Sequence, residues 1–361
     1  MDFETISYLS CEGKLSSHAP DIPSTILLKA YRVLMITRLV DERMITLQRQ
    51  GTISFSLSSV GEEVCAVASA AALEFADWMY PQYREAGVMF WRGFTIQEFL
   101  HQMFGNAEDL ILGRQMPNHF GSRALNVVQV SSPIGTKIPH AAGCAYAMKL
   151  QKEPTVAICY FGEGATSEGD FHVGVNFAAV RKAPAIFFCR NNGYAISTPV
   201  SRQFASDGVA PKAIGYGIPG FRVDGNDFFA VYAIVKKARQ HCLEGKGPVL
   251  IEAMTYRMGA HSTSDDPSLY RLDQEVETWK TKCPILRLRR YLTLQGLWND
   301  KKEKELIEEI SNEISSAIAK AKDTALPDLT SLIEHVYFEV PEELKKQLRE
   351  IKECGGSPCL S

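Results

Sequence analysis

Two short polar segments follow apolar runs in the middle of the chain. Glu163 lies between two glycines after the apolar run 155–161, and Asn192 follows the apolar run 185–189. If both runs are parallel strands joined by a helix, their carboxyl ends meet at one edge of the sheet, where Glu163 and Asn192 can converge. Carboxylate and amide oxygens are ligands that magnesium prefers, and it takes its remaining oxygens from water and a phosphate-bearing ligand. The two segments therefore predict a magnesium site beside a phosphate.

The surroundings of Glu163 suit an anion. Gly162 and Gly164 allow close approach to the backbone, and a helix expected to begin near Ser167 directs its first amide groups at a negative charge. A diphosphate bridged by magnesium is the ligand that this arrangement predicts. Taken alone, Gly-Glu-Gly is also typical of a tight turn, and Asn-Asn of a polar turn.

Positioning these residues requires alternating strands and helices. Apolar runs bounded by glycine, proline or polar residues predict buried strands, and 3.6-residue periodicity predicts the helices between them. This order indicates an α/β fold with a parallel sheet flanked by helices, followed by a helical C-terminal extension. The expected strands are 155–161, 185–189, 221–223 and 248–256, and the expected helices are 24–50, 61–75, 138–150, 167–182, 227–243 and 299–322. Ser24 or Thr25 is placed to cap the first helix, and Asp227 a later one.

The 361 residues, 45% hydrophobic and 22% charged, are typical of one large domain with small extensions. We predict an N-terminal arm at 1–24, the α/β domain at 25–325 and a C-terminal extension at 326–361. A net charge of -3 and the lack of a long apolar window argue against nucleic-acid and membrane binding. Nine scattered cysteines without a CxxC pair favour reduced thiols. The first residues have the character of neither a signal peptide nor a transit peptide.

Several motifs together resemble one family. Residues 162–197 (GEGATSEGDFHVGVNFAAVRKAPAIFFCRNNGYAIS) are similar to the thiamine diphosphate motif, which opens with Gly-Asp-Gly or Gly-Glu-Gly at a strand end and closes with Asn after the next strand. From about Tyr31 to Tyr337, the chain resembles the alpha subunits of thiamine diphosphate-dependent branched-chain 2-oxo acid dehydrogenases. The other blocks that carry this resemblance are QYRE at 82–85, GRQMP at 113–117, SSP at 131–133 and IEAMTYR at 251–257.

The resemblance implies a thiamine diphosphate-binding fold and a set of site residues. Magnesium would be held by Glu163, Asn192 and the Tyr194 carbonyl. His261 would contact the diphosphate and act as the catalytic acid-base group, since imidazole titrates near neutral pH. The other implied cofactor-binding residues are Tyr83, Arg84, Ser132, Ile134, Gly162, Gly164, Ala165 and Arg190.

One block departs from the family pattern. In relatives, a structural potassium is held by residues at the positions of Ser131, Pro133 and Thr136 and by a glutamine, which Lys137 replaces here. An ammonium group has donors but no acceptor and cannot ligate a cation. Potassium is therefore in doubt, and we predict that the Lys137 ammonium lies at or near its place, donating to the Ser131 and Thr136 hydroxyls or nearby carbonyls.

The implied activity is oxidative decarboxylation of branched 2-oxo acids, with transfer of the acyl group to a lipoyl group of an acyltransferase component. No second motif supplies the carboxylate needed against the pyrimidine ring. The resemblance implies that a beta subunit provides it within an alpha2beta2 heterotetramer, so that this chain alone is inactive. The compartment would be the cytoplasm in a bacterium and the mitochondrial matrix for a processed eukaryotic chain.

Rival functions remain open at this stage. Pyruvate and acetoin dehydrogenase alpha subunits share the fold and cofactor. A dinucleotide-binding oxidoreductase is disfavoured because GEGATS is not GxGxxG, and a non-catalytic scaffold because the magnesium ligands are intact. The polar segment 258–274 predicts a mobile loop. In mitochondrial relatives a serine at the Ser262 position is phosphorylated, whereas Leu272 stands at their second phosphorylation site.

Overall fold

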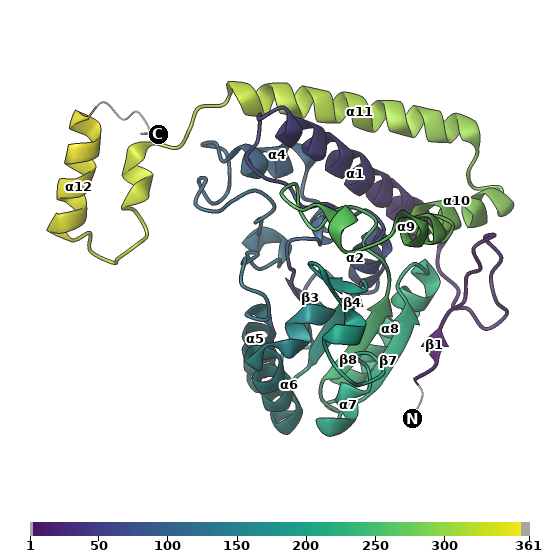
Figure 1. The fold of residues 1–361 in the computed structure, drawn as a ribbon. Coiled ribbons are helices and arrows are strands. Elements are labelled where there is room, and N and C mark those ends of the chain that lie inside the picture. Colours follow the sequence, from purple (N-terminus) through teal and green to yellow (C-terminus); the bar gives the residue numbers. More distant parts are fainter. Residues whose placement is uncertain (1–2, 355–361) are drawn as a thin grey trace.

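The computed structural model describes residues 3–354, and its centre is one sheet of six parallel strands (Figure 1). The strand order is β1-β7-β8-β4-β3-β2. The α/β fold predicted from the alternation of strands and helices is confirmed. The strands are β1 (Thr5–Ile6), β2 (Trp78–Tyr80), β3 (Ala157–Gly162), β4 (Ala185–Asn191), β7 (Gly220–Asp224) and β8 (Val249–Met254).

The sheet is covered on both faces. Along β3 and β4, Cys159 and Phe187 belong to one core cluster, whereas Tyr160 and Phe188 belong to the other. Successive side chains of a strand point to opposite faces, so a strand covered on both sides must be apolar at nearly every position. This explains why the central strands are continuous apolar runs in the sequence.

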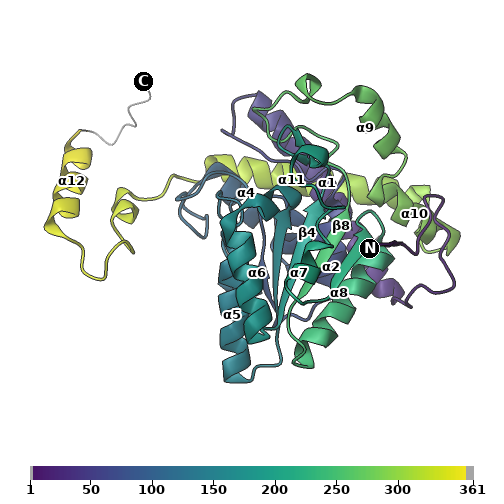
Figure 2. The same cartoon turned by 60° about the horizontal axis from the view of Figure 1, so that its bottom comes forward.

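Helices α5 (Lys137–Gln151) and α6 (Gly169–Arg181) lie side by side against one face (Figure 2). The two helices approach so closely that a Cβ atom at Gly174 of α6 would lie 2.9 Å from the Ile138 Cγ2 atom of α5. The small residues Ala141, Ala142 and Ala145 of α5 are buried in the core cluster on this face. The opposite face is covered by α1 (Ser24–Arg49), α2 (Glu63–Ala71), α3 (Ala86–Arg92) and α8 (Phe228–Leu243).

Most of the predicted elements are present, with shifted ends. The Asp227 side chain accepts from the Phe229 and Ala230 amides and caps α8, as predicted. The predicted cap of α1 is wrong, because Pro23 precedes the helix and no side chain caps it. Strands β1 and β2, only two and three residues long, have no clear periodicity in the sequence and were not predicted.

After β8 the chain is mainly helical, as expected, with α9 (Asp273–Lys280), α10 (Pro284–Leu294) and α11 (Asp300–Asp323). Helix α11 packs on α1 and on α4 (Ile96–Phe104). The following segment, with α12 (Glu342–Glu353), stands away from the main body (Figures 1 and 2). Arg114 ties this segment to the body by donating to the Ser331 carbonyl at 2.6 Å.

The predicted 1–24 arm contributes β1 to the sheet, where it pairs with β7. Residues 1–2 of that arm, residues 355–361 of the predicted C-terminal extension and Cys359 lie outside the described residues. The other eight cysteines are free thiols. Within residues 3–354 no helix combines the length and apolar character needed to cross a membrane.

Candidate active site

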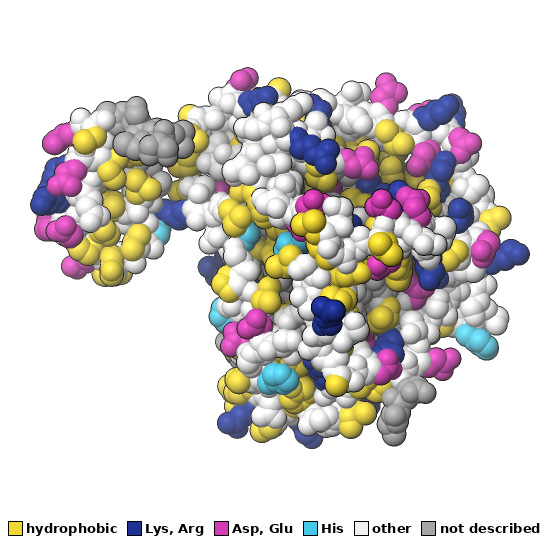
Figure 3. Space-filling view, viewed as in Figure 1, with side chains coloured by type: hydrophobic (Ala, Val, Ile, Leu, Met, Phe, Trp, Pro, Cys, Tyr) yellow, Lys and Arg dark blue, Asp and Glu magenta, His cyan; other side chains and the backbone are white. Residues whose placement is uncertain are grey.

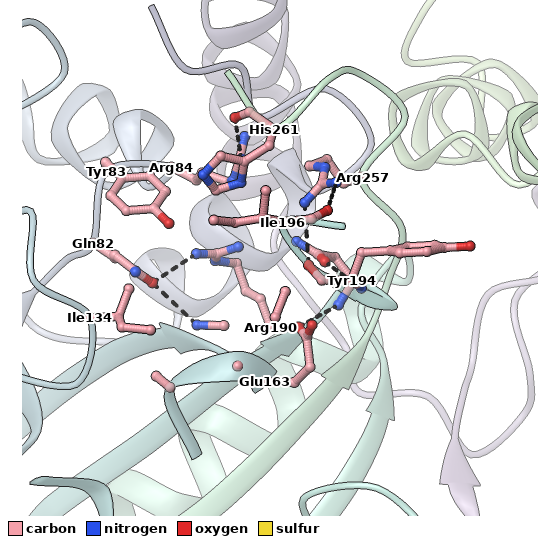
Figure 4. A pocket seen from close by; sticks show the side chains of 15 residues that line it. Gln82, Tyr83, Arg84, Ile134, Glu163, Arg190, Tyr194, Ile196, Arg257 and His261 are labelled. Atoms are coloured by element: carbon pink, nitrogen blue, oxygen red, sulfur yellow. Dashed lines mark hydrogen bonds between the residues drawn. The ribbon is translucent and has the colours of Figure 1, made fainter. Parts of the chain in front are cut away.

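A cavity of about 170 Å³ opens at the carboxyl edge of the sheet, beyond the ends of β3 and β4 (Figure 4). This is the edge at which parallel α/β sheets bind ligands. It gathers nearly all of the cofactor and magnesium residues predicted from the sequence. The lining residues are Gln82, Tyr83, Arg84, Ile134, Gly162, Glu163, Gly164, Ala165, Arg190, Asn192, Tyr194, Ala195, Ile196, Arg257 and His261.

Glu163 begins a 3-10 turn directly after β3 and is only 1% exposed. Its Oε1 accepts from the Gln203 amide at 3.1 Å, and its Oε2 accepts from the Asn192 backbone N–H at 3.3 Å. Burial raises the Glu163 pKa, although the Gln203 hydrogen bond opposes this effect. In the described chain no arginine or lysine pairs with this carboxylate. A divalent cation would supply the missing positive charge, so Glu163 fits a metal site.

Asn192 and Tyr194 complete the predicted donor set. The Asn192 Nδ2 atom donates to the two carboxylate oxygens of Glu62 at 3.2 and 3.1 Å, and its Oδ1 accepts from the Tyr194 N–H at 3.2 Å. The Tyr194 carbonyl accepts from Arg257 at 3.2 Å and keeps a second lone pair. One carboxylate, one amide and one carbonyl form an all-oxygen set, which suits magnesium.

This set of oxygen ligands fits other metals less well. Within residues 3–354 no three or more histidine, cysteine, aspartate or glutamate side chains cluster in a way that could hold a metal ion. Transition metals such as zinc are usually bound by nitrogen or sulfur ligands.

Arg190 lies at the end of β4 and is 2% exposed. Its Nη1 donates to Glu62 at 2.5 Å and its Nε to Glu85, and Nη2 is 3.5 Å from the Gln82 Oε1 atom. Burial opposes the charge of Arg190, but Glu85 and Glu62 raise its pKa overall. Arg190 lines the cavity, but much of its hydrogen-bonding capacity is already used within the protein.

Arg84 and His261 lie next to each other on the opposite side of the cavity (Figure 4). One Nη atom of Arg84 lies 3.2 Å from the His261 Nδ1 atom and donates to the His261 carbonyl at 2.6 Å. Because a guanidinium can only donate, Nδ1 must accept, and the imidazole proton therefore resides on Nε2. The His261 backbone N–H donates to Asp265 at 2.7 Å, which fixes the loop around the ring.

Burial, followed by the positive charges of Arg84 and Arg257, lowers the pKa of His261 from 6.5 to about 4. The ring is therefore neutral in the free chain near pH 7. Since the unfolded chain takes up this proton first, the contribution to stability is lost as the pH falls from 6.5 towards about 4.

The turn after Asn192 holds a strained residue. Ile196 has a φ of 55°, a backbone conformation that is unfavourable for a β-branched side chain. The hairpin of β5 (Tyr194–Ala195) and β6 (Thr198–Pro199) surrounds it, and Arg257 donates to its carbonyl at 2.5 Å. Such strain persists where the neighbouring structure imposes it, often at ligand sites.

Ser132 does not line the cavity but lies near its rim residue Ile134. Its hydroxyl lies 2.6 Å from the Nε2 atom of buried His119, whose Nδ1 faces the Pro117 carbonyl at 3.1 Å. Since that carbonyl can only accept, Nδ1 carries the proton and the Ser132 hydroxyl donates to Nε2. The Ser132 side chain is thereby fixed beside the site.

The predicted monovalent-cation residues Ser131, Pro133 and Thr136 also lie outside the cavity. The Ser131 hydroxyl is buried without a partner in the described chain. The Lys137 ammonium therefore does not donate to the Ser131 hydroxyl, which was one of its predicted acceptors. Burial lowers the pKa of Lys137.

Comparison with known proteins decides the family. A family model described as "Dehydrogenase E1 component" matches residues 31–330. The chain belongs to the dehydrogenase E1 component family. It is 49% identical over 337 residues to the mitochondrial 2-oxoisovalerate dehydrogenase subunit alpha of Caenorhabditis elegans, covering 93% of this chain and 78% of that protein. It is 48% identical to the human protein of the same name, covering 92% and 75%, and 46% identical to subunit alpha 2 of Arabidopsis thaliana, covering 92% and 71%.

The structure adds residues to this E1-family site that sequence reasoning did not select. Gln82, Ala195 and Arg257 line the cavity within or beside the motifs, so adjacency to a motif was the available signal. Glu62 and Gln203 lie outside those motifs and act through hydrogen bonds that only the fold reveals.

The low pKa of His261 leads to a prediction. In the cofactor-free protein, reaction of the neutral imidazole with diethyl pyrocarbonate, followed by mass spectrometry, should show a midpoint at about pH 4. Arg84→Gln removes a nearby charge and should raise the midpoint towards 6.5. Arg114→Gln, remote from the cavity, should leave it unchanged. A midpoint near 6.5 in the unaltered chain would contradict the assignment.

Proposed function

We propose that this chain is the alpha subunit of a branched-chain 2-oxo acid dehydrogenase. In this function it would bind thiamine diphosphate and magnesium, decarboxylate branched 2-oxo acids and pass the acyl group to a lipoyl group of an acyltransferase component. The observation that carries the proposal is the convergence of Glu163, Asn192, Arg84 and His261 on one cavity. The shared family and the names of the relatives support it.

The cofactor would bind with its diphosphate end in this cavity. Glu163, Asn192 and the Tyr194 carbonyl would hold magnesium, while Tyr83 and Arg84 would meet the diphosphate. Gly164 and Ala165 would lie against the cofactor, and Ser132 and Ile134 near its rings. Bound thiamine diphosphate supplies the electron sink for decarboxylation.

The protein would hold the His261 ring in place and control the transfer of its proton. Arg84 holds the His261 ring by its Nδ1 atom and leaves the Nε2 proton available for transfer at the reacting group. In the free chain His261 is neutral because burial and two arginines disfavour its cation. A diphosphate placed beside those arginines would offset their charge and raise the pKa of His261 towards the range useful for acid-base catalysis.

A beta subunit is part of the proposal. The cavity of about 170 Å³ is smaller than the ~300–1,000 Å³ typical of pockets that enclose a whole ligand of this size, so a second chain would complete it. Hydrophobic side chains gather on the outlying C-terminal segment (Figure 3), where Phe338, Leu326 and Tyr337 are exposed. Exposed apolar groups of this extent favour a protein partner. We propose the alpha2beta2 heterotetramer that the resemblance implies.

Potassium, regulation and location also remain proposals. The buried Ser131 hydroxyl without a partner would suit a cation, whereas Lys137 argues against one. Ser262, on the His261 loop, would be a phosphorylation site only where a suitable kinase exists. The relatives are named mitochondrial, so the mitochondrial matrix is the proposed location if the source is eukaryotic.

Replacing the proposed metal carboxylate tests the cofactor assignment. Glu163→Ala should abolish magnesium-dependent binding of thiamine diphosphate, measured by calorimetry on the assembly with a co-expressed beta chain. Glu168→Ala changes an exposed carboxylate five residues further along and should bind normally. Unchanged affinity in Glu163→Ala would refute the metal site, provided that both variants melt at the wild-type temperature.

Substrate preference and subunit requirement are tested in one assay. Turnover is followed by reduction of an artificial electron acceptor, with and without the beta chain, during decarboxylation of 2-oxoisovalerate or pyruvate and during cleavage of acetoin. We expect no turnover by the chain alone, because the pyrimidine-side carboxylate comes from the partner, and a preference for 2-oxoisovalerate in the assembly. Turnover by the lone chain would show that the carboxylate is here, and a preference for pyruvate or acetoin would favour the rival functions.

A further inference from the structure

Glu62 is a buried carboxylate outside the thiamine diphosphate motif. It lies at the N-terminus of α2, is 1% exposed and accepts from the Arg190 guanidinium at 2.5 Å. Both of its oxygens also accept from the Asn192 Nδ2 atom, at 3.2 and 3.1 Å. Paired with a buried arginine, Glu62 is an ionised group that can only accept hydrogen bonds.

This contact decides which way the Asn192 amide points. Its NH₂ end donates to Glu62, so its oxygen end must face the opposite direction. There Oδ1 accepts from the Tyr194 N–H at 3.2 Å and keeps a lone pair for a cation. A flipped amide would place an oxygen against the Glu62 carboxylate and direct its NH₂ group, which cannot ligate a cation, at the metal.

Gln203 fixes the other side-chain ligand. Its Nε2 donates to the Glu163 Oε1 atom at 3.1 Å and to the Thr198 carbonyl at 2.9 Å, so its amide orientation is set by two acceptors. Its own Oε1 is buried without a partner in the described chain, which suits it to accept from a water molecule on a bound cation.

We propose that Glu62 and Gln203 are positioning residues, which orient Asn192 and Glu163 so that both direct an oxygen at magnesium before the cofactor binds. The inference rests on the proposed function. It extends the site beyond the motif to the start of α2 and to Gln203, which directly follows a 3-10 turn at Val200–Arg202. Groups that hold metal ligands in this way commonly contribute about 10- to 100-fold to metal affinity.

The chain offers a matched control for Glu62. Glu85 is equally buried and also pairs with Arg190, but it does not contact Asn192. The probe is Mn²⁺, whose free concentration is followed by electron paramagnetic resonance in the alpha–beta assembly with thiamine diphosphate. We expect Glu62→Gln to weaken Mn²⁺ binding about 10- to 100-fold, and Gln203→Leu to weaken it in the same direction. Glu85→Gln should bind close to wild type.

A double variant exchanges the donor and acceptor of the hydrogen bond between residues 62 and 192. In Glu62→Gln/Asn192→Asp, the new amide can donate to the new carboxylate, so the hydrogen bond and the net charge are kept and an oxygen still faces the metal. This double variant should recover most of the Mn²⁺ affinity. If Glu62→Gln alone fails to assemble with the beta chain, the Mn²⁺ affinity of the double variant tests the proposal instead. Wild-type affinity in Glu62→Gln, an equal loss in Glu85→Gln, or no recovery in the double variant would overturn the proposal. Failure of the wild-type assembly to bind Mn²⁺ would instead refute the proposed function.

Discussion

The buried pairing of Arg190 with Glu62 and Glu85 is the interaction on which the site depends. It joins the end of β4 to the N-termini of α2 and α3, which lie much earlier in the sequence. Burying these charges is costly, and removing one partner of such a pair typically destabilises a protein by about 3–5 kcal/mol. The two carboxylates are not equivalent in this cluster, because only Glu62 also accepts hydrogen bonds from the Asn192 amide. When the cluster forms, the edge of the sheet has one fixed geometry, and the Asn192 amide is held within it.

Charge is divided unequally across the cavity. Arg190 pairs with Glu62 and Glu85, and Glu62 also lies 4.0 Å from the Arg84 Nε atom. Arg257, by contrast, makes its hydrogen bonds to the Tyr194 and Ile196 carbonyls and to a tyrosine hydroxyl rather than to a carboxylate. The side that holds His261 carries the two arginines Arg84 and Arg257, and burial together with their charges keeps the imidazole neutral by lowering its pKa. A dianionic diphosphate is suited to that side, and a cation to Glu163. The same charge distribution therefore affects both the binding of a diphosphate and the protonation of His261.

Much of the cavity lining could be predicted from the sequence, because Glu163 and Asn192 follow continuous apolar strands. Glu163 and Asn192 could be paired from the alternation of strand and helix, since parallel strands place their carboxyl ends together. The roles of Glu62 and Gln203 could not be predicted, because their partners are set by the tertiary fold rather than by spacing. The resemblance implies that Arg190 binds the cofactor, but its carboxylate partners Glu62 and Glu85 could not be predicted from the sequence. Strands β1 and β2 are too short for a periodic pattern and depend on pairing with longer neighbours.

The central claim is that magnesium binds between the ends of β3 and β4. The most direct test is a crystal structure of the alpha–beta assembly with thiamine diphosphate and Mn²⁺, with data collected at the manganese absorption edge. The account predicts an anomalous peak within bonding distance of the Glu163 carboxylate, the Asn192 Oδ1 atom and the Tyr194 carbonyl. A peak elsewhere, or bound cofactor without a peak beside Glu163, would contradict it.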